Sequence, residues 1–593
     1  MTALSGAPST PGTESRADPI ISLRAAGDRA VLVELRTLGG VLALTSHLAA
    51  AEHAGDIDVV DVVAAATTVL IVAESASAVA RAAAYVRSLH LEDAAHTPGR
   101  LVRITTVYDG ADLDELAQLA GLSPEALVAS HSGTVWDAAF GGFAPGFTYL
   151  THDAAPSVPR RTSPRTVVPA GSVALAGAYS AVYPGESPGG WQLIGHTDAV
   201  MWDLSREDPA LVQPGDRVQF VPVRESTSLA ATAADGGLVQ GAGPSQPAEP
   251  NTSGERGPAE ASRPAEAGLV VVRPGMQTTI QDLGRPGRAA LGVSPAGALD
   301  RGALRQANRI AGNAPGDPAL EVLLGGLELR AASDQVLAVT GARVPLRITA
   351  APAAVVEPEA PTGADGPETP QARAKDPSTV REAPLDTPFA LLAGETLSLG
   401  IATEGLRAYV AVRGGINAPL VLGSASTDSL SGIGPAPLAE GQTLRVRPML
   451  GAHVVGLPEV PRPLPGGAMG GATVLRVLPG PREDWFTDAS ARAFFGQEWT
   501  VTPQSNRVGL RLDGAPLERA REGELTSEGT VRGSVQVPAN GLPVLFLADA
   551  PVTGGYPVIG VVVSADLDLA AQLPPGATVR FVPLTSSEGT SHA

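Results

Sequence analysis

Several side chains that carry enzyme chemistry are missing or scarce in this sequence. Its 593 residues include no cysteine, which excludes a thiol nucleophile, a thiolate metal site, an iron–sulfur cluster and a disulfide framework. Lys375 is the single lysine and lies in a Pro-rich polar stretch, so we expect no Walker A motif, no Schiff base and no biotin attached to this chain. Of nine histidines, only His453 lies between positions 268 and 584. A Ser–His–Asp triad or a histidine metal site is therefore not expected there, and we name no metal ligands.

Basic side chains are also outnumbered, 42 against 61 acidic ones, so the formal net charge is −19. Such a surface disfavours binding to nucleic acids and to anionic membranes. The longest apolar run, Val59–Ala73, is interrupted by Asp61 and is too short to span a bilayer. The N-terminal stretch MTALSGAPSTPGTESRADP lacks the apolar segment of a signal peptide. We therefore expect a cytoplasmic protein with neither a nucleic-acid nor a membrane partner.

Three segments hold few large apolar side chains and are rich in small residues and proline. Such segments bury too little apolar surface to offset the entropy of ordering. We interpret residues 1–18 as a disordered N-terminus, 226–267 as an interdomain linker and 352–386 as a loop insertion.

Four blocks remain between these segments. Residues 19–100 mix short apolar strands with Ala-rich helical stretches, which predicts a small α/β domain. Residues 101–225, 268–456 and 473–584 consist mainly of short strands separated by Pro and Gly, with one clear helix at Leu299–Ala311. The predicted fold class is therefore mainly β with an α/β portion at the N-terminus.

A weak repeat connects the blocks. The second block ends in LVQPGDRVQFVP (211–222) and the fourth in QLPPGATVRFVP (572–583), while Gly394 and Gly441 begin similar turns in the third. Each pattern is typical of a Pro/Gly turn that enters an alternating strand. Similar ends on separate blocks predict related β-barrel domains, although a common turn-plus-strand pattern also recurs by chance.

The densest candidate for a binding site in the second block is FGGFAPGFTYL (140–150). Its glycines and Pro145 impose a tight backbone, and its aromatic side chains, Phe143 and Phe147 among them, are unfavourable to expose. The segment is either a buried aromatic turn or a pocket wall.

Two further segments of this block carry polar chemistry. Arg160, Arg161 and Arg165 lie within six residues of one another and form either a solvated basic face or a clamp for carboxylate or phosphate. In SPGGWQLIGHT the backbone N–H groups of Gly189 and Gly190 could bind an anion, and Trp191 could stack on a ligand. His196 is either structural or a general base. We expect Arg161, Arg165 and the two glycines to bind the anionic ligand.

In the second half, polar residues interrupt strand-like segments at three places. Gln281, Asp282 and Arg285 form the first group. Gln504 and Arg507 lie in TPQSNRVG, and the third group is the stretch ADAPVTGGYP, with Asp549, Thr553, Gly554, Gly555 and Tyr556. An Asp beside paired glycines fits a phosphate- or amide-binding turn as well as an ordinary turn. His196, Asp549 and Asp282 are the candidates for proton transfer, and the other named side chains are candidates for substrate or nucleotide binding.

Long motifs in this sequence resemble a known family. GFAPGFTYL, VPRRTSPRTVVPAGSVALAG and VYPGESPGGWQLIGHT in the first half resemble the B subunit of bacterial ATP-dependent 5-oxoprolinase, also described as allophanate-hydrolase-subunit-1-like and as kinase-inhibitor-like. VVRPGMQTTIQDLGRPG, LGVSPAGALDRGALRQANRIAGN and VTPQSNRVGLRLDG in the second half resemble the C subunit, which belongs to a biotin-dependent carboxyltransferase-like family. The chain is thus identified as a fusion of B-like and C-like parts.

The resemblance implies cyclophilin-like β-barrel domains and ATP-dependent opening of 5-oxo-L-proline to L-glutamate, together with a separate A subunit. It implies ATP with Mg²⁺ as cofactors and a small amide or lactam as substrate. A carboxyltransferase that acts on urea-like amides with carboxybiotin from another protein is an alternative, and so is a regulator that binds a histidine kinase. The oligomeric state, a homo-oligomer included, stays open.

Two departures from the family pattern bear on the substrate. The family's Gly-Ser-Arg-Ser-Thr-Asp is here GSASTD, with Ala425 in place of the arginine, and its following Gly-Gly-x-x-Gly-Arg is here GPAPL from Gly434. The family's Asp-Arg-Gln-Thr-Thr is here DAPVT, with Ala550 after Asp549. Three arginines and a glutamine expected near the site are therefore absent.

Overall fold

The computed structural model describes residues 19–91, 99–152, 158–161, 165–224, 267–350, 380–448, 454–465, 471–523 and 525–584. The predicted disordered N-terminus, linker residues 226–266 and residues 352–379 of the predicted insertion lie outside the described residues. Residues 380–386, predicted to be loop, are described, and Val380–Glu382 form strand β20 at the edge of a sheet. The mainly β fold with an N-terminal α/β part is confirmed.

The N-terminal domain (residues 19–91) is a four-stranded antiparallel sheet in the order β1-β2-β4-β3, with two helices. The side chains of Thr37 and Ser75 accept hydrogen bonds from backbone N–H groups of the first turns of these helices, which sets where each helix begins. Leu and Val side chains of both layers form the core. The elements are β1 (Ile20–Ala25), β2 (Ala30–Leu35), α1 (Leu38–Ala54), β3 (Asp61–Ala64), β4 (Thr68–Val72) and α2 (Ala76–Ser88).

Barrel 1 (residues 99–224) contains a seven-stranded sheet in the order β12-β9-β10-β7-β6-β13-β5. A bridge between Val107 and His196 joins its two edges. The first and last strands, β5 and β13, pair in parallel. The elements are β5 (Leu101–Thr106), α3 (Leu113–Leu119), α4 (Pro124–Gly133), β6 (Val135–Gly141), β7 (Thr148–Thr151), β8 (Arg165–Val168), β9 (Ser172–Ala176), β10 (Tyr179–Val182), β11 (Ser187–Gly189), β12 (Gln192–His196) and β13 (Arg217–Pro222).

Barrel 2 (residues 471–584) is a closed barrel in the order β25-β32-β29-β30-β27-β26-β33, and its first and last strands also pair in parallel. The elements are β25 (Thr473–Pro479), η3 (Glu483–Trp485), α6 (Asp488–Gly496), β26 (Trp499–Val501), β27 (Gly509–Asp513), β28 (Glu528–Gly529), β29 (Ser534–Gln536), β30 (Val544–Phe546), β31 (Thr553–Gly554), β32 (Val558–Val562), η4 (Ser564–Asp566), α7 (Leu567–Ala570) and β33 (Thr578–Pro583).

The two barrels have the same cyclic strand order. β5, β12, β9, β10, β7, β6 and β13 correspond to β25, β32, β29, β30, β27, β26 and β33 in turn, and each barrel carries a separate two-stranded ribbon, β8–β11 and β28–β31. The repeated PGDRVQFVP and PGATVRFVP sequences form β13 and β33, the parallel last strands. The sequence repeat therefore reflects a duplicated fold.

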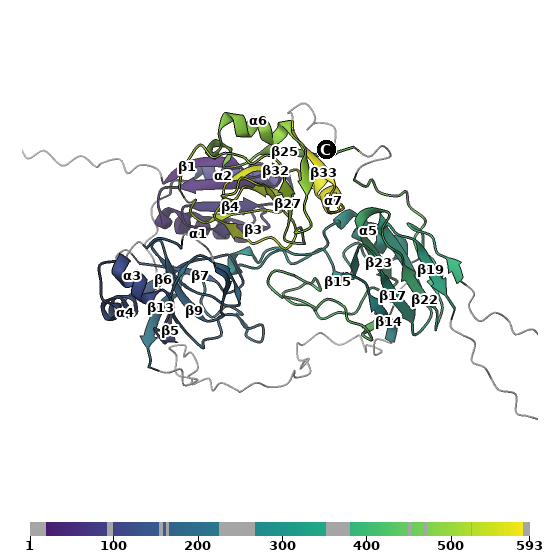
Figure 1. Cartoon of the computed structure of the whole chain (residues 1–593), viewed down its shortest axis with the longest axis horizontal. Helices are drawn as coiled ribbons and strands as arrows, with labels where there is room; N and C mark the ends of the chain where they lie inside the picture. Colours follow the sequence, from purple (N-terminus) through teal and green to yellow (C-terminus); the bar gives the residue numbers. More distant parts are fainter. Residues whose placement is uncertain are drawn as a thin grey trace, which may run out of the picture.

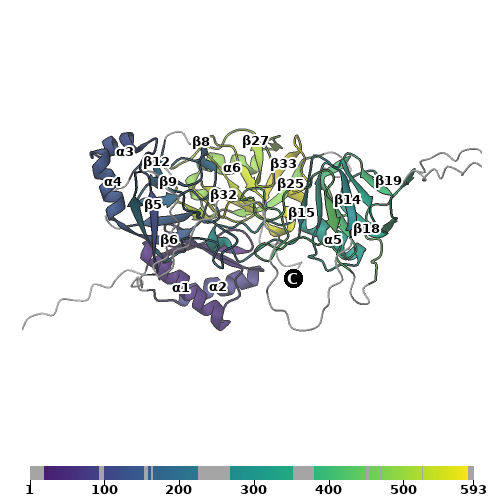
Figure 2. The ribbon, with the colours of Figure 1, turned by 90° about the horizontal axis from the view of Figure 1, so that it is seen from below.

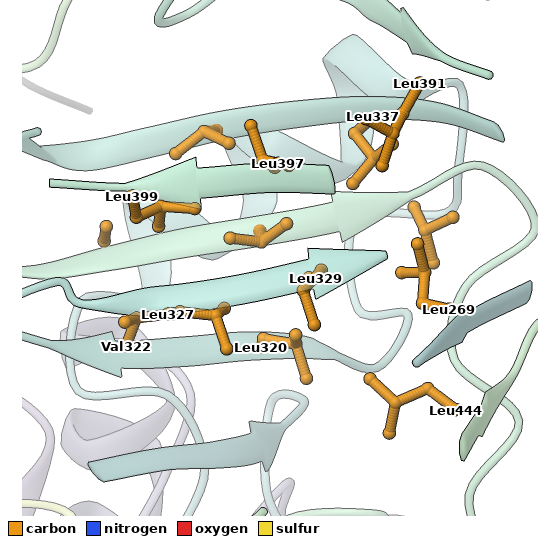
Figure 3. Packing of buried hydrophobic residues seen from close by; sticks show 14 of the residues in the cluster. Leu269, Leu320, Val322, Leu327, Leu329, Leu337, Leu391, Leu397, Leu399 and Leu444 are labelled. Atoms are coloured by element: carbon orange, nitrogen blue, oxygen red, sulfur yellow. The ribbon is translucent and has the colours of Figure 1, made fainter. Parts of the chain in front are cut away.

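The sandwich (residues 267–448) differs from the barrels. Its strands form one six-stranded and one five-stranded sheet rather than a closed barrel, and Leu and Val side chains of both sheets fill the space between them (Figure 3). The strands are β14 (Ala267–Pro274), β15 (Gln277–Gln281), β16 (Ala319–Leu323), β17 (Leu327–Ala331), β18 (Gln335–Arg343), β19 (Leu346–Thr349), β20, β21 (Phe389–Leu391), β22 (Thr396–Leu399), β23 (Glu404–Val412) and β24 (Thr443–Arg445). Asp300 is the N-cap residue of helix α5 (Arg301–Ala311), and its side chain accepts a hydrogen bond from the N–H of Ala303.

Barrel 2 lies between barrel 1 and the sandwich along the horizontal axis of Figures 1 and 2, and in Figure 1 it is raised above the other two. The N-terminal domain packs against barrel 2, although the two lie at opposite ends of the sequence. Leu70 of β4 contacts the backbone of Gly529, and the Asp28 carboxylate accepts hydrogen bonds from Ser564. The Asp61 carboxylate accepts hydrogen bonds from the N–H groups of Gly287 and Ala289. The B-like and C-like halves are thus packed into one body.

Candidate functional site

A cavity of about 490 Å³ lies where the N-terminal domain, barrel 1 and barrel 2 meet. Ala66 of the N-terminal domain contributes one wall and Leu525, Thr526 and Ser527 of barrel 2 another. Barrel 1 contributes the rest, which includes four aromatic side chains: Phe140, Tyr149, Tyr179 and Trp191. The volume suits a small ligand, and aromatic walls with a few polar groups are typical of ligand sites.

The aromatic walls are rigid because the rings pack on one another. Phe140 stacks on Tyr149 at a centroid distance of 4.5 Å, and Tyr149 meets Tyr179 and Trp191 edge-on at 5.6 and 5.5 Å. Burial raises the pKa of Tyr149, so its hydroxyl keeps its proton and can donate a hydrogen bond. The hydroxyl lies 3.4 Å from Ser527 Oγ across the junction between the barrels.

Arg160 is the cationic side chain in the cavity lining. A Cβ atom added at Gly555 of barrel 2 would lie 3.4 Å from Arg160 Nη1, so this arginine reaches the predicted TGGY turn of the other barrel. A guanidinium next to tyrosine and serine hydroxyls can hold a carboxylate while the aromatic walls hold an apolar ring.

The FGGFAPGFTYL segment is both a buried aromatic turn and a pocket wall. Phe143 has a positive φ of 61° and donates its N–H to Thr553 Oγ1 of barrel 2 at 2.9 Å. A Cβ at Gly142 would lie 2.7 Å from the same oxygen, so only glycine allows this approach. Phe147 and Pro145 are buried, and Phe147 packs behind Trp191 and Tyr149. The predicted residues Phe143 and Thr553 are therefore brought together.

The predicted anion clamp contacts a carboxylate of this chain. Arg161 Nη1 and Arg165 Nη2 donate to Asp112 Oδ1 at 2.5 and 2.7 Å, and the N–H of Leu193 donates to Asp112 Oδ2. Burial of Asp112 opposes ionisation, but the hydrogen bonds and charges of the two arginines and Leu193 outweigh it and lower the pKa of Asp112. Two guanidinium groups share one carboxylate, which leaves one positive charge in excess.

The other predicted groups of barrel 1 lie around this cluster. Gly189 of β11 pairs with Arg165 of β8, and the carbonyl of Gly190 accepts the N–H of Arg161. Trp191 lies in the cavity wall instead. His196 Nδ1 lies 2.8 Å from Asp109 Oδ1, and its side chain is 41% exposed. His196 therefore has a carboxylate partner, as a general base often has, but it is not part of the cavity lining.

In the sandwich, Asp282 accepts hydrogen bonds from the hydroxyls of Ser424 and Ser426 and from the N–H groups of Gly284 and Ala425. These bonds occupy both oxygens, so the geometry favours a structural role for Asp282 over proton transfer. Arg285 is 2% exposed and donates to the carbonyls of Ser426 and Val421. Gln281 is fully buried and donates to Thr279 Oγ1 and to the carbonyl of Thr427.

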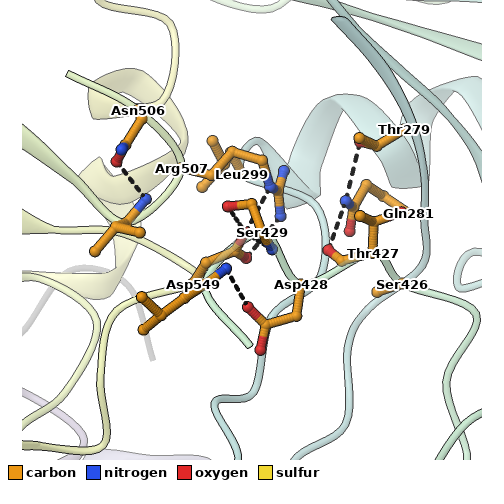
Figure 4. Close-up of polar contacts among 12 residues, drawn as sticks. Thr279, Gln281, Leu299, Ser426, Thr427, Asp428, Ser429, Asn506, Arg507 and Asp549 are labelled. Carbon is orange, nitrogen blue, oxygen red and sulfur yellow. Dashed lines mark hydrogen bonds and ion pairs between the residues drawn. The ribbon is translucent and has the colours of Figure 1, made fainter. Parts of the chain in front are cut away.

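Asp549 and Arg507 form the centre of a second polar cluster, between barrel 2 and the sandwich (Figure 4). Arg507 Nε and Nη2 both donate to the Asp549 carboxylate at 2.9 Å, and its Nη1 donates to Glu321. Ser429 donates to Asp549 through both N–H and hydroxyl. Asp549 is completely buried and saturated with donors, which again favours a structural role.

The remaining predicted residues lie on barrel 2. Thr553 and Gly554 form β31. Tyr556 is 42% exposed, and the Arg519 guanidinium lies 5.8 Å from the centre of its ring. Gln504 is exposed and is not part of the cavity lining. Ala425 and Ala550, where the resemblance led us to expect arginines, are buried, so no cation at these positions faces the cavity.

Within the described ranges, no group of three or more His, Asp and Glu side chains could hold a metal ion. No described helix is long and apolar enough to cross a membrane. Phe140 and Tyr149 lie in the segment that was predicted as a possible pocket wall, and Arg160 in the predicted arginine group. Tyr179 and the Leu525–Ser527 stretch are cavity residues that the sequence analysis did not select. Strand alternation on β6, β7 and β10 could have placed the three aromatic rings on one face, but no pattern pointed to residues 525–527, which come from another barrel.

Comparisons with known proteins agree with this architecture. The model of the carboxyltransferase domain, subdomains C and D, matches residues 21–212, and the model of subdomains A and B matches residues 291–583. The chain is 37% identical to the 5-oxoprolinase C subunit of Escherichia coli over 327 residues, which are 54% of this chain and 92% of that protein. It is 42% identical to the 5-oxoprolinase B subunit of Haemophilus influenzae over 129 residues, 21% of this chain and 60% of that protein. Urea amidolyase of Saccharomyces cerevisiae is 32% identical over 344 residues, but this chain spans only 17% of it.

A crystal structure of the protein TTHA0988 has a similar fold over nearly the whole chain. It superimposes with a TM-score of 0.72 at 31% identity and covers 93% of this chain and 99% of that one. The predicted resemblance is thereby confirmed. The chain belongs to the carboxyltransferase-domain family and joins a part homologous to the B subunit of 5-oxoprolinase to a part homologous to the C subunit of that enzyme.

Proposed function

We propose that this chain forms the 5-oxoproline site of a 5-oxoprolinase and that the complete enzyme also requires a separate A-type subunit. The proposed reaction is ATP-dependent opening of 5-oxo-L-proline to L-glutamate. The observation that carries the proposal is the cavity at the junction of the three domains, which combines aromatic walls with Arg160 and with the hydroxyls of Tyr149 and Ser527. Relatives of both halves are named 5-oxoprolinase subunits.

In this proposal, the carboxylate of 5-oxoproline binds Arg160 and its ring lies against Trp191 and Phe140. We assign the carboxylate to Arg160 rather than to Arg161 or Arg165, because Arg160 lines the cavity and the other two do not. Tyr149, whose pKa is raised by burial, donates a hydrogen bond to the lactam oxygen. Such a donor stabilises negative charge on that oxygen.

The lactam is a poor electrophile, and its activation is where ATP enters. The lactam oxygen attacks the γ-phosphorus and the bond to ADP breaks. As the lactam nitrogen loses its proton, the oxygen stays on the ring carbon as a phosphate ester, which makes that carbon more electrophilic. A first water then adds to the ring carbon and the C–N bond breaks, and a second water releases phosphate from the resulting acyl phosphate. Mg²⁺ would be held by the phosphate oxygens of ATP and one or two carboxylates, and it would neutralise charge on the transferred phosphoryl group.

A second candidate function is carboxyl transfer to a urea-like amide. It is favoured by the match to carboxyltransferase-domain models and by the identity to urea amidolyase. The same cavity would then hold the amide, and carboxybiotin would have to come from another protein.

The test is a reconstitution of the full chain with a purified A-type subunit of 5-oxoprolinase. The first proposal expects L-glutamate and ADP to form from 5-oxoproline and ATP, without bicarbonate or a biotinylated protein. Strict dependence of turnover on a biotinylated carrier and bicarbonate would favour carboxyl transfer. If neither 5-oxoproline nor urea is consumed, both proposals are wrong.

A further inference from the structure

The two barrels can be compared position by position around their two-stranded ribbons. In each barrel a glycine lies against the backbone of the strand that follows the ribbon. In barrel 1, a Cβ added at Gly110 would lie 2.3 Å from Leu193 O. In barrel 2, a Cβ added at Gly480 would lie 2.2 Å from Val558 O. Two residues later, the N–H of Asp112 donates to Leu193 O and the N–H of Arg482 donates to Val558 O. Asp112 and Arg482 are therefore equivalent positions.

These equivalent positions carry opposite charges, and so do their partners. In barrel 1, Asp112 binds Arg165, which pairs with Gly189 across the ribbon. In barrel 2, Arg482 binds Glu528, which pairs with Gly554 across the ribbon. The ion pair is kept in place but reversed in sign.

In barrel 2 this region binds a folded domain. The N-terminal domain supplies Glu34 of β2 as a second carboxylate for Arg482. Leu70 contacts Gly529 of the ribbon, and a Cβ at Gly27 would lie 2.8 Å from Val561 of β32. The ribbon, the adjoining strand and the central ion pair are thus all covered.

The described residues on the equivalent part of barrel 1 are exposed or half-exposed. His196 of β12 corresponds to Val561 and has 41% of its side chain exposed. Thr166, which corresponds to Gly529, is exposed, and Val167 next to it is 51% exposed. Arg161 Nε and Arg165 Nη1 are buried donors without a hydrogen-bond partner among the described residues. We call Arg161, Arg165, Val167 and His196 the ribbon face, since Arg165 and Val167 lie on the same side of strand β8.

We propose that the ribbon face of barrel 1 is the docking surface for the A-type subunit, which places a carboxylate side chain between Arg161 and Arg165. The identity of this partner rests on the proposed function. The positive charge in excess over Asp112 favours an acidic partner, although the net charge of the whole chain is −19. A protein fits better than a free phosphate, because exposed Val167 offers apolar contact and because the same face of barrel 2 already binds a folded domain.

The test uses isothermal titration calorimetry, without substrate, to measure association of the full chain with a purified A-type subunit of 5-oxoprolinase. Val167→Glu adds a repelling charge to the ribbon face without touching Asp112, and we expect Kd to rise at least tenfold. Arg161→Gln is expected to raise Kd at least fivefold. Arg330→Glu is the matched control, because Arg330 is an exposed arginine on the sandwich strand β17, and it is expected to leave Kd unchanged. Thermal unfolding of each variant shows that it is folded.

Unchanged Kd values for Val167→Glu and Arg161→Gln would overturn the proposal, as would absence of any association of the wild-type chain. If Arg161→Gln raises KM for ATP tenfold and leaves Kd for the subunit unchanged, the arginines bind nucleotide and the proposal is wrong. If the wild-type complex forms, the variants weaken it, and 5-oxoproline is still not consumed, docking is supported while the proposed function fails.

Discussion

Barrel 1 and barrel 2 share one strand order, yet they use it differently. Barrel 2 lies between the sandwich and barrel 1 and binds the N-terminal domain through Arg482, so most of its polar positions serve internal contacts. Barrel 1 keeps a cavity lined by Arg160 and Trp191 and an exposed ribbon face. The difference shows that two barrels of the same strand order can have different roles, depending on which surfaces other domains cover.

The strongest test of this difference compares the two ion-pair centres. Arg507→Met leaves Asp549 without its buried cationic partner, whereas Glu321 keeps Arg407. We expect the free energy of unfolding to fall by about 3–5 kcal/mol. Arg165→Gln in barrel 1 leaves Arg161 on Asp112, and we expect a loss of only about 1–2 kcal/mol. Urea unfolding measures both, with Arg330→Gln as a surface control expected within about 0.5 kcal/mol of wild type. Equal losses for Arg507 and Arg165 would show that both barrels depend on their ion pairs alike.

The second prediction concerns the pH dependence of the free energy of unfolding, to which a buried histidine of barrel 1 should contribute. His131 is buried between Tyr108 OH and Ser180 Oγ, and burial lowers the pKa of His131 to about 3. Below about pH 6.5 the unfolded chain binds a proton on His131, whereas the folded protein leaves this imidazole neutral. The free energy of unfolding should therefore fall by about 1.4 kcal/mol per pH unit as the pH is lowered from 6 to 4.

The equivalent position in barrel 2 is Phe494, because Trp136 Nε1 donates to His131 O and Trp499 Nε1 donates to Phe494 O. His131→Phe should flatten the pH dependence of unfolding in this range, although it lowers stability at pH 7 by leaving Ser180 unpartnered. Denaturant unfolding at several pH values measures this, and an unchanged slope would show that another group dominates.

The cavity prediction compares two equivalent arginines. The N–H of Val158 donates to the carbonyl of Gly177 in barrel 1, and the N–H of Leu517 donates to the carbonyl of Gly541 in barrel 2. Arg160 lies two residues after Val158, and Arg519 lies two residues after Leu517. The two arginines are therefore at equivalent positions. Losing a charge-assisted hydrogen bond is worth about 1.5–3 kcal/mol, so Arg160→Gln should raise KM for 5-oxoproline about tenfold to a hundredfold. Arg519→Gln should change KM less than twofold. Steady-state kinetics of the reconstituted enzyme measure both KM values. A larger increase in KM for Arg519→Gln than for Arg160→Gln would indicate that 5-oxoproline binds at barrel 2.

The smallest effect concerns the contact of the N-terminal domain with barrel 2. Burial opposes ionisation of Glu34, but hydrogen bonds from Ser22, Arg482 and Arg24 outweigh it and lower the pKa of Glu34 to about 2. Because the folded pKa lies below the unfolded value, this contact stabilises the protein above about pH 4.5 and is lost as the pH falls towards 2. Glu34→Gln should lower the free energy of unfolding by about 1–2 kcal/mol at pH 7 and have little effect near pH 2. Chemical unfolding at both pH values checks this, and a loss of equal size at pH 2 would contradict it.

The sequence by itself determined much of the local structure. The repeated Pro/Gly turns with alternating residues located β13 and β33, and the helix predicted at Leu299–Ala311 is α5, which begins two residues later, at Arg301. These features depend on neighbours a few residues apart, so short patterns carry them. The absence of cysteine and the single lysine likewise excluded whole classes of chemistry before any fold was known.

Only the tertiary structure decided which polar residues share a site. Arg160, Trp191 and Ser527 meet in one cavity across two barrels, whereas the adjacent Arg161 faces Asp112. Asp282 and Asp549, selected from the sequence as proton-transfer candidates, are saturated with hydrogen-bond donors from segments more than 100 residues away. Such contacts depend on how whole domains pack, and a linear pattern holds no information on which face of one barrel meets another.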